Sequence, residues 1–152
     1  MKPPDMEAAV KVLVATDGSD PSLRACELAA SMVHGQPSVR VRVVTVLSYT
    51  LYPYALFPGG ELSDEGARAR AADEAADDAT RDACAIFEKA GFPVECKHRY
   101  GNAADEIVSE IDEWEPDLVV IGRRGVHGIE RMIGSVSEHV LRRADIATLV
   151  VP

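Results

Sequence analysis

The chain has 152 residues, of which 47% are apolar and 27% charged, and its formal net charge is −9. This length suits one domain with a single core, and we expect residues 1–152 to form one. The acidic balance argues against binding of nucleic acid or an anionic membrane, because both require a basic surface. Without a run of roughly 20 apolar residues or the apolar segment of a secretory signal, we expect a cytoplasmic protein with no membrane partner.

Five segments predict β-strands. Val10–Thr16 is apolar and β-branched, which is typical of a strand buried on both faces of a parallel sheet. Val39–Leu47 alternates with arginine in its first half and is apolar in its second half. Residues 93–100 are more polar, which suits the edge of a sheet. Residues 118–121 are wholly apolar, and Ala147–Val151 is the last apolar run.

Four helices are predicted between these strands. The first follows a turn at residues 17–20 and ends at Gly35. The second spans residues 63–90, and its many acidic positions are expected to face solvent. The third starts at Asn102, and the fourth spans residues 134–143. The positions expected to face the sheet are Leu23, Cys26, Leu28, Ala29, Met32 and Val33 in the first helix and Ile107, Val108, Ile111 and Trp114 in the third.

Residues 48–62 form the longest predicted loop. The loop contains three of the four tyrosines, Tyr49, Tyr52 and Tyr54. Loops of this length in compact domains are often functional. It is therefore either a cover for a ligand or an ordinary packed surface loop.

Strands and helices alternate throughout, in the order β-α-β-α-β-α-β-α-β. This pattern predicts an α/β fold, a single domain with a five-stranded parallel sheet and helices on both faces. Ligands of such sheets bind outside the carboxyl ends of the strands, where the strand order reverses. The strand ends that would line such a site are Thr16-Asp17, Val46-Leu47 and Ile121-Gly122.

The connection after the fourth predicted strand is rich in glycine. A helix that starts at Gly134 would point free backbone amides toward a phosphate, and the hydroxyls of Ser135 and Ser137 would add donors. The alternative is a connection that uses glycine only to turn the chain. The glycines are Gly122, Gly125, Gly128 and Gly134.

The same stretch is basic within an acidic chain. Residues 121–143 contain five arginines against two glutamates. A small anionic ligand is therefore compatible with the net charge, and Arg123, Arg124 or Arg131 could contact it. The lysine-bearing pattern GxxxxGK[ST] and the dinucleotide pattern GxGxxG are both absent from the chain, which favours holding a nucleotide over cleaving it.

The glycine spacing carries a family resemblance. Gly122-x2-Gly125, eight residues and then Gly134-Ser135 resemble the signature of the universal stress protein family, G-x2-G-x9-G-[S/T], with a spacer at residues 126–133 that is one residue shorter. The resemblance covers nearly the whole chain, including VLVATDGSDPS near its start and GSVSEHVLRRADIATLVV at its end. It implies a Rossmann-like, adenine nucleotide alpha hydrolase-like fold with an ATP site.

The resemblance also implies which residues bind the nucleotide. The ends of the first, second and fourth strands would contact the adenosine, and the glycine loop and last helix would contact the phosphates. Magnesium or manganese would be held mainly by the phosphates rather than by side chains, and no catalytic residue is implied. For Asp17, the alternative role is to form a turn with Gly18. The implied nucleotide-binding residues are Ala15, Thr16, Asp17, Val46, Ile121, Gly122, Arg124, Gly125, Gly134, Ser135, Val136 and Ser137.

The family pairs as homodimers through its last strand, and the resemblance implies the same partner here. Physical reasoning agrees, because Ala147–Val151 is an apolar edge strand. The outer edge of such a strand needs cover. A second copy of the chain would supply it.

Four functions follow from these observations. The leading hypothesis is a cytoplasmic ATP-binding stress protein that acts as a sensor or switch. Slow ATP hydrolysis ranks lower, because no base or lysine is evident for positioning water. A third hypothesis is binding of another adenine nucleotide, cyclic AMP or AMP. The fourth, a nucleotide-free dimerisation protein, is disfavoured because the chain keeps its glycines.

The cysteines and histidines predict no metal site. The chain has three cysteines, Cys26, Cys84 and Cys96. Their number is odd and no two have CxxC spacing, so neither a disulfide framework nor a zinc site is suggested. We expect all three to be buried apolar thiols. The four histidines share no metal-ligand spacing.

Overall fold

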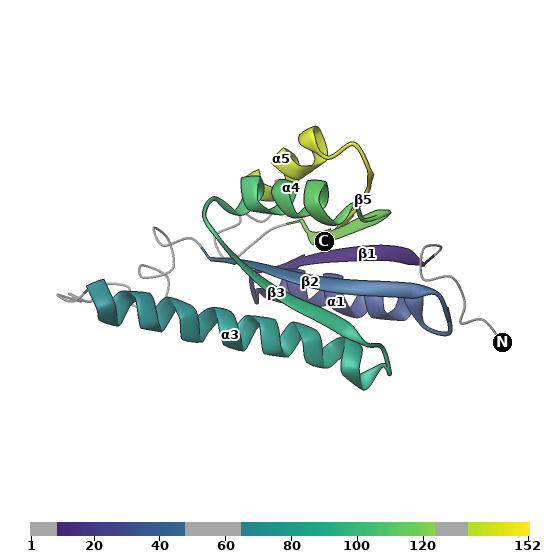
Figure 1. Ribbon diagram of the computed structural model, residues 1–152, viewed down its shortest axis with the longest axis horizontal. Helices are drawn as coiled ribbons and strands as arrows, with labels where there is room; N and C mark the ends of the chain where they lie inside the picture. The colour runs from purple at the N-terminus through teal and green to yellow at the C-terminus, as the bar shows by residue number, and fades with distance from the viewer. Residues whose placement is uncertain (1–8, 48–64, 124–133) are drawn as a thin grey trace.

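The structure is a computed structural model that describes residues 9–47, 65–123 and 134–152. In these residues five parallel strands form one sheet in the order β3-β2-β1-β4-β5, with helices on both faces (Figure 1). The predicted α/β class and alternating order are confirmed. The predicted loop at residues 48–62 lies outside the described residues. The strands are β1 (Val10–Thr16), β2 (Val39–Leu47), β3 (Val94–Tyr100), β4 (Leu118–Gly122) and β5 (Ala147–Val151).

The helices divide between the two faces of the sheet. In Figure 1, α1 and α3 cover one face, and α4 and α5 cover the other. Helix α4 begins as predicted at Asn102, whose side chain accepts hydrogen bonds from the amides of Ala104 and Asp105. None of the described helices has the length and apolar composition needed to cross a membrane. The helices of the described residues are α1 (Asp20–Val33), α3 (Glu65–Lys89), α4 (Ala103–Trp114) and α5 (Ser135–Arg143).

Helix α1 is rotated relative to the sequence expectation. The inward positions predicted for Leu28 and Met32 are wrong, because the two residues are 41% and 52% exposed. The buried stripe consists mainly of small residues, including Ala25, Ala29 and Ala30. Small side chains let the helix lie close to the sheet, and this close approach leaves the larger pair at the rim. On α4, the four predicted inward residues are all buried, as expected.

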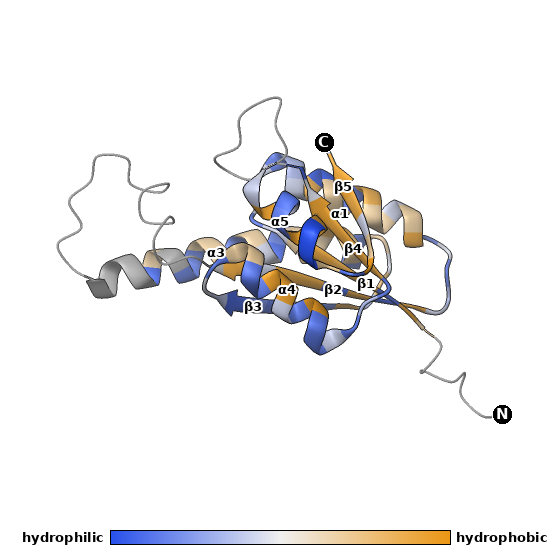
Figure 2. Cartoon of the chain, turned by 90° about the horizontal axis from the view of Figure 1, so that it is seen from above, coloured by the Kyte–Doolittle hydropathy of each residue, from blue (hydrophilic) through white to orange (hydrophobic). Residues whose placement is uncertain are grey.

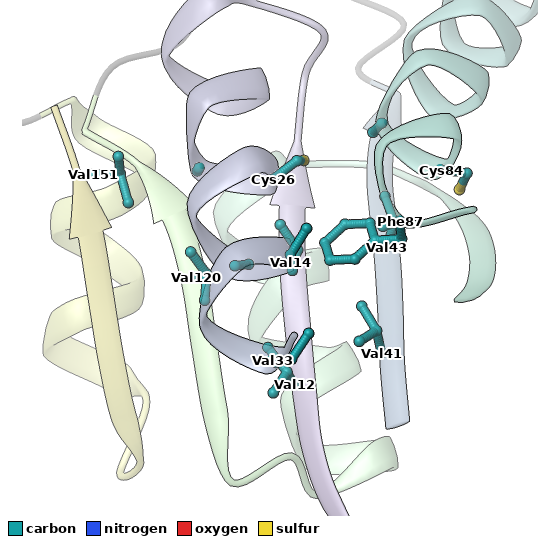
Figure 3. Close-up of a cluster of buried hydrophobic side chains, with 14 residues drawn as sticks. Val12, Val14, Cys26, Val33, Val41, Val43, Cys84, Phe87, Val120 and Val151 are labelled. Carbon is teal, nitrogen blue, oxygen red and sulfur yellow. The ribbon is translucent and has the colours of Figure 1, made fainter. Parts of the chain in front are cut away.

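The alternation of side chains along β1 builds a separate apolar layer on each face of the sheet. Val12 and Val14 face α1 and α3, where they pack with the fully buried Phe87 of α3 (Figure 3). Leu13 and Ala15 face α4 and α5. Burial of a large apolar side chain such as Phe87 contributes about 1.5–3 kcal/mol. The two layers together fix β1 at the centre of the molecule and thereby fix where its carboxyl end lies.

The edge strand β3 is hydrophilic, as predicted (Figure 2). Its side chains Lys97 and Arg99 meet the fully buried carboxylate of Glu110 on α4, and Arg42 of β2 joins them. Each of the three cations has a nitrogen 2.7 Å from a Glu110 oxygen. Burial would raise the pKa of Glu110, but hydrogen bonds from the three cations outweigh it and the pKa is lowered. The ionised carboxylate therefore holds α4 against the polar half of the sheet.

The cysteine prediction is wrong for two of the three residues. Cys84 of α3 and Cys96 of β3 form a disulfide, with their Cα atoms 6.6 Å apart. The two meet because the chain turns at Gly91 after α3 and β3 returns along the same helix, an arrangement that no spacing rule describes. Cys26 is a free buried thiol, as expected, and burial raises its pKa to about 12.

We predict that Glu110→Gln lowers the free energy of unfolding by about 3 kcal/mol, because three cations would lose their shared buried carboxylate. Urea denaturation measures the loss. Glu113→Gln is the matched control. Glu113 is also a residue of α4 that pairs with Arg99, but its side chain is 54% exposed. A much smaller loss is expected there. Equal losses in the two variants would contradict the role assigned to Glu110.

The carboxylates on this side of the sheet also predict how stability depends on pH. Hydrogen bonds from Arg99 lower the pKa of Glu113 to about 2, and those from Arg42 and Arg40 lower the pKa of Glu95. A lowered folded-state pKa stabilises the fold above the unfolded-state value of about 4.3, and this stabilisation is lost as the pH falls through the folded-state value. We therefore expect the denaturant midpoint to fall steadily from about pH 5 to about pH 2. A midpoint independent of pH in this window would refute the expectation.

Candidate functional site

The strand order reverses between β1 and β4, and the two strands end side by side. Ala15 pairs with Ile121 in the parallel register, so Thr16 and Gly122 follow at the same edge. From this edge the chain leaves β1 toward α1 on one face and leaves β4 toward α5 on the other. A crevice between two oppositely directed connections is where ligands of open parallel sheets bind.

A tight turn at residues 17–19, called the Asp17 turn below, follows β1. The carboxylate Oδ1 of Asp17 accepts hydrogen bonds from the backbone amide of Ser19 at 3.0 Å and from its hydroxyl at 2.5 Å. Gly18 has a φ of +78°, and its amide donates to the Thr16 hydroxyl. A Cβ on Gly18 would lie 2.8 Å from the Cβ of Ala79 on α3, so this position favours glycine for its φ and for its contact. The turn-forming role considered for Asp17 is therefore present.

The start of α1 rests directly on the end of β4. A Cβ on Gly122 would lie 3.0 Å from the carbonyl carbon of Pro21 and 3.0 Å from the amide nitrogen of Ser22. The hydroxyls of Ser22 and Thr16 are also hydrogen-bonded to each other at 2.9 Å. Gly122 thus allows the first turn of α1 to close one side of the crevice.

The start of α5 is fastened to the ends of β4 and β5 through the backbone of Arg123. The Arg123 carbonyl accepts hydrogen bonds from the amide of Gly134 at 2.7 Å and from the buried hydroxyl of Ser137 at 2.9 Å. The Arg123 amide donates to the carbonyl of Val151 at 2.6 Å. The N-cap residue, Gly134, has no side chain with which to cap the helix. The amides of its first turn, beginning at the exposed Ser135, therefore have no partner within the helix.

The side chain of Arg123 contains a buried nitrogen atom, Nε, without a hydrogen-bond partner among the described residues. A buried unpaired donor costs about 1–3 kcal/mol, and more on a charged group. Because the Arg123 backbone is hydrogen-bonded to the start of α5, an anion bound at those amides would lie near this arginine, so the residues present fit a phosphate group.

The sequence-predicted residues fall into three groups. Three of them, Ala15, Val46 and Ile121, are buried in the apolar layer under α4 and α5, and Val136 packs against that layer. Those at the ends of β1 and β4 and at the start of α5 are joined through the contacts of Thr16, Gly122 and Arg123 described above. Two lie outside the described residues: Arg124 and Gly125.

Sequence reasoning missed two contributors. Ser22 pairs with Thr16 and also donates its hydroxyl to the carbonyl of Ser19 at 2.9 Å. Its position three residues after Ser19 matches a local side-chain-to-backbone pattern and could have been noticed. Ala79 contacts the Gly18 position although the two residues lie far apart in the sequence. No local pattern indicates that contact.

Comparison with known proteins identifies the family. The family model for the universal stress protein family matches residues 10–152. This chain belongs to the universal stress protein family. The universal stress protein Rv1636 of Mycobacterium tuberculosis is 31% identical over 160 residues, which cover 96% of this chain and 98% of that protein.

Solved structures of this family share the fold. Universal stress protein UspA from Lactobacillus plantarum has a TM-score of 0.76 at 19% identity, with 94% of this chain and 97% of that chain covered. A universal stress protein solved in complex with cAMP has a TM-score of 0.68 at 27% identity, with 95% and 98% covered. The Rossmann-like fold implied by the resemblance is therefore confirmed.

Proposed function

We propose that this universal stress protein binds an adenine nucleotide in the crevice between β1, β4 and the start of α5. The observation that carries the proposal is the start of α5, which is hydrogen-bonded to the backbone of Arg123, a residue whose buried Nε has no hydrogen-bond partner among the described residues. Helix starts of this kind attract phosphates, because backbone amides and the helix dipole both favour negative charge there. The similar protein solved with cAMP supports an adenine nucleotide as the ligand.

The charges at the two helix starts suggest how the nucleotide is oriented. The start of α1 carries Asp17 and Asp20 and, at Pro21, no amide hydrogen, so it repels phosphate. The first turn of α5 contains one acidic residue, Glu138, whose charge is paired with Arg142 at 2.7 Å. The phosphates therefore belong at α5, and the sugar and base belong toward the Asp17 turn and β2.

Each implied residue then has a distinct part in binding. The strand ends at Ala15, Val46 and Ile121 border the base through their backbone, because their side chains are buried in the layer under α4 and α5, while Thr16, Asp17 and Gly122 border the sugar. Backbone amides and the hydroxyl of the exposed Ser135 contact the phosphates, whereas the buried Ser137 hydroxyl is already donated to the Arg123 carbonyl. The phosphate residues in this proposal are Arg124, Gly125, Gly134, Ser135, Val136 and Ser137.

We take ATP as the ligand and a cytoplasmic stress sensor or switch as the role. Arg123 and its sequence neighbours Arg124 and Arg131 would supply positive charge for a polyphosphate, and magnesium or manganese would be held by the phosphates. Holding rather than hydrolysis is favoured, because no lysine follows Gly134. The second candidate is cyclic AMP, favoured by the complex of the 27% identical protein.

We predict that Arg123→Gln weakens ATP binding about tenfold or more, because a charge-assisted hydrogen bond contributes about 1.5–3 kcal/mol. Calorimetry measures the affinity of both proteins for ATP, ADP, AMP, cyclic AMP and adenosine. The affinity for adenosine should not change, because adenosine has no phosphate. Arg142→Gln is the matched control, an exposed arginine at the far end of α5. Failure of all five ligands to bind at millimolar concentration would refute the proposal, and tightest binding of cyclic AMP would select the second candidate.

We also propose a homodimer formed through the outer edge of β5. This strand is an edge of the sheet: it pairs with β4 on one side, and no strand of the described residues covers its other side. Its side chains from Thr148 to Val150 are half-buried. Such edges are prone to pair with another strand. Sedimentation should show a dimer for the native chain, and Val150→Pro should shift it to monomer, because the Val150 amide faces away from β4 and proline removes this edge hydrogen-bond donor. A native chain that sediments as a monomer at high concentration would exclude the dimer.

A further inference from the structure

The Cys84–Cys96 disulfide joins a buried position to an exposed one. Cys96 is an exposed residue of the edge strand β3. Cys84 is buried on α3 in the same apolar layer as Phe87 (Figure 3). A thiol or peroxide in solvent therefore reaches the pair from the Cys96 side. Exposed disulfides are typically labile, regulatory or catalytic ones.

The disulfide is one of a series of contacts between α3 and β3. One helical turn before Cys84, the Thr80 hydroxyl lies 2.7 Å from Nε2 of His98, two residues beyond Cys96. Four helical residues advance about 6 Å and two strand residues about 6.6 Å, so the two elements stay in step while running in opposite directions. The covalent bond therefore fixes the register of α3 along the edge strand.

The same part of α3 supports the Asp17 turn. The Thr80 hydroxyl is hydrogen-bonded to that of Thr45 at 2.6 Å, and Thr45 is the register partner of Thr16. Ala79, the preceding residue of α3, contacts Gly18 within the turn. A shift of α3 along β3 would break both contacts. The position of the turn therefore depends on the position of α3.

Helix α3 has few other anchors over this stretch. Its buried side chains between positions 76 and 84 are small, namely Ala76, Ala79, Thr80, Ala83 and Cys84. Small side chains bury little apolar area and contribute correspondingly little to docking. The disulfide is the strongest constraint on the helix near the turn.

We infer that Cys84 and Cys96 are a redox-active pair that regulates nucleotide binding: the disulfide holds α3 against the Asp17 turn, and reduction releases it. This inference rests on the proposed function, because the regulated ligand is the nucleotide. In a reducing compartment the pair is a dithiol. It closes when a hydroperoxide is present, so the nucleotide site responds to oxidative stress.

The chemistry balances with a hydroperoxide as oxidant. The exposed Cys96 thiolate attacks a peroxide oxygen, which forms a sulfenic acid and releases an alcohol, or water from hydrogen peroxide. The Cys84 thiol then attacks the Cys96 sulfur, and the hydroxyl leaves as water. For reduction, a dithiol reductant attacks Cys96, Cys84 leaves as a thiolate and takes up a proton, and the second reductant thiol resolves the mixed disulfide.

The experiment compares ATP affinity of the full chain after hydrogen peroxide and after excess dithiothreitol. Reduction should weaken binding about fivefold or more, a typical size for coupling between sites. Cys96→Ser should bind with the weaker affinity under both treatments. Cys26→Ala keeps the pair and should show the full response, which controls for the third cysteine.

Two further measurements separate failure of this inference from failure of the proposed function. Thiol titration should give one free thiol after peroxide and three after dithiothreitol; three after both would overturn the inference. ATP affinity equal in both states would overturn it while leaving the proposed function intact. If no nucleotide binds, the proposed function fails. Hydrogen exchange then tests the coupling between the disulfide and the Asp17 turn. Faster exchange of α3 and residues 17–19 after reduction supports the coupling, and unchanged exchange overturns it.

Discussion

Strand β1 pairs in parallel with β2 on one side and β4 on the other, and the rest of the molecule depends on this double pairing. Parallel strands need crossover connections, which are right-handed, so connections that travel in opposite directions along the sheet lie on opposite faces. Helix α1 therefore lies on one face and α5 on the other, and the ends of β1 and β4 are left open between them. Gly122 and the backbone of Arg123 then fasten each helix start to that opening.

The two halves of the sheet hold their helices by different interactions. Around β1 and β4 the contacts are apolar on both faces (Figure 2). Toward the edge strand β3 they become ionic, with Glu110 neutralising cations from two strands. On the opposite face of β3 the contacts are small side chains, hydroxyls and the disulfide. The covalent bond lies at the end of the stretch of α3, positions 76 to 84, whose buried side chains are small.

Much of the fold could be predicted from local patterns. Apolar β-branched runs predicted β1, β2 and β5 with their observed bounds, and Asn102 predicted the start of α4. The orientation of α1 was predicted incorrectly at Leu28 and Met32, because helical spacing gives a stripe but not how closely the helix approaches the sheet. The disulfide was missed because Cys84 and Cys96 are joined by a helix-to-strand reversal rather than by a recognised spacing.

The candidate site divides in the same way. Glycine and serine positions after β4, and the acidic turn after β1, could be read as a candidate nucleotide site from sequence, since their spacing resembles the family signature. The contacts between Gly18 and Ala79 and between Ser137 and the Arg123 carbonyl could not, because they join residues that the chain brings together only on folding. By itself, the sequence determined the family, the order of elements and the edge of the sheet where the candidate site lies, because these follow from periodicity and motif. Tertiary structure alone decided the partners of Arg123, Glu110 and the two linked cysteines, because packing between distant elements sets which side chains meet.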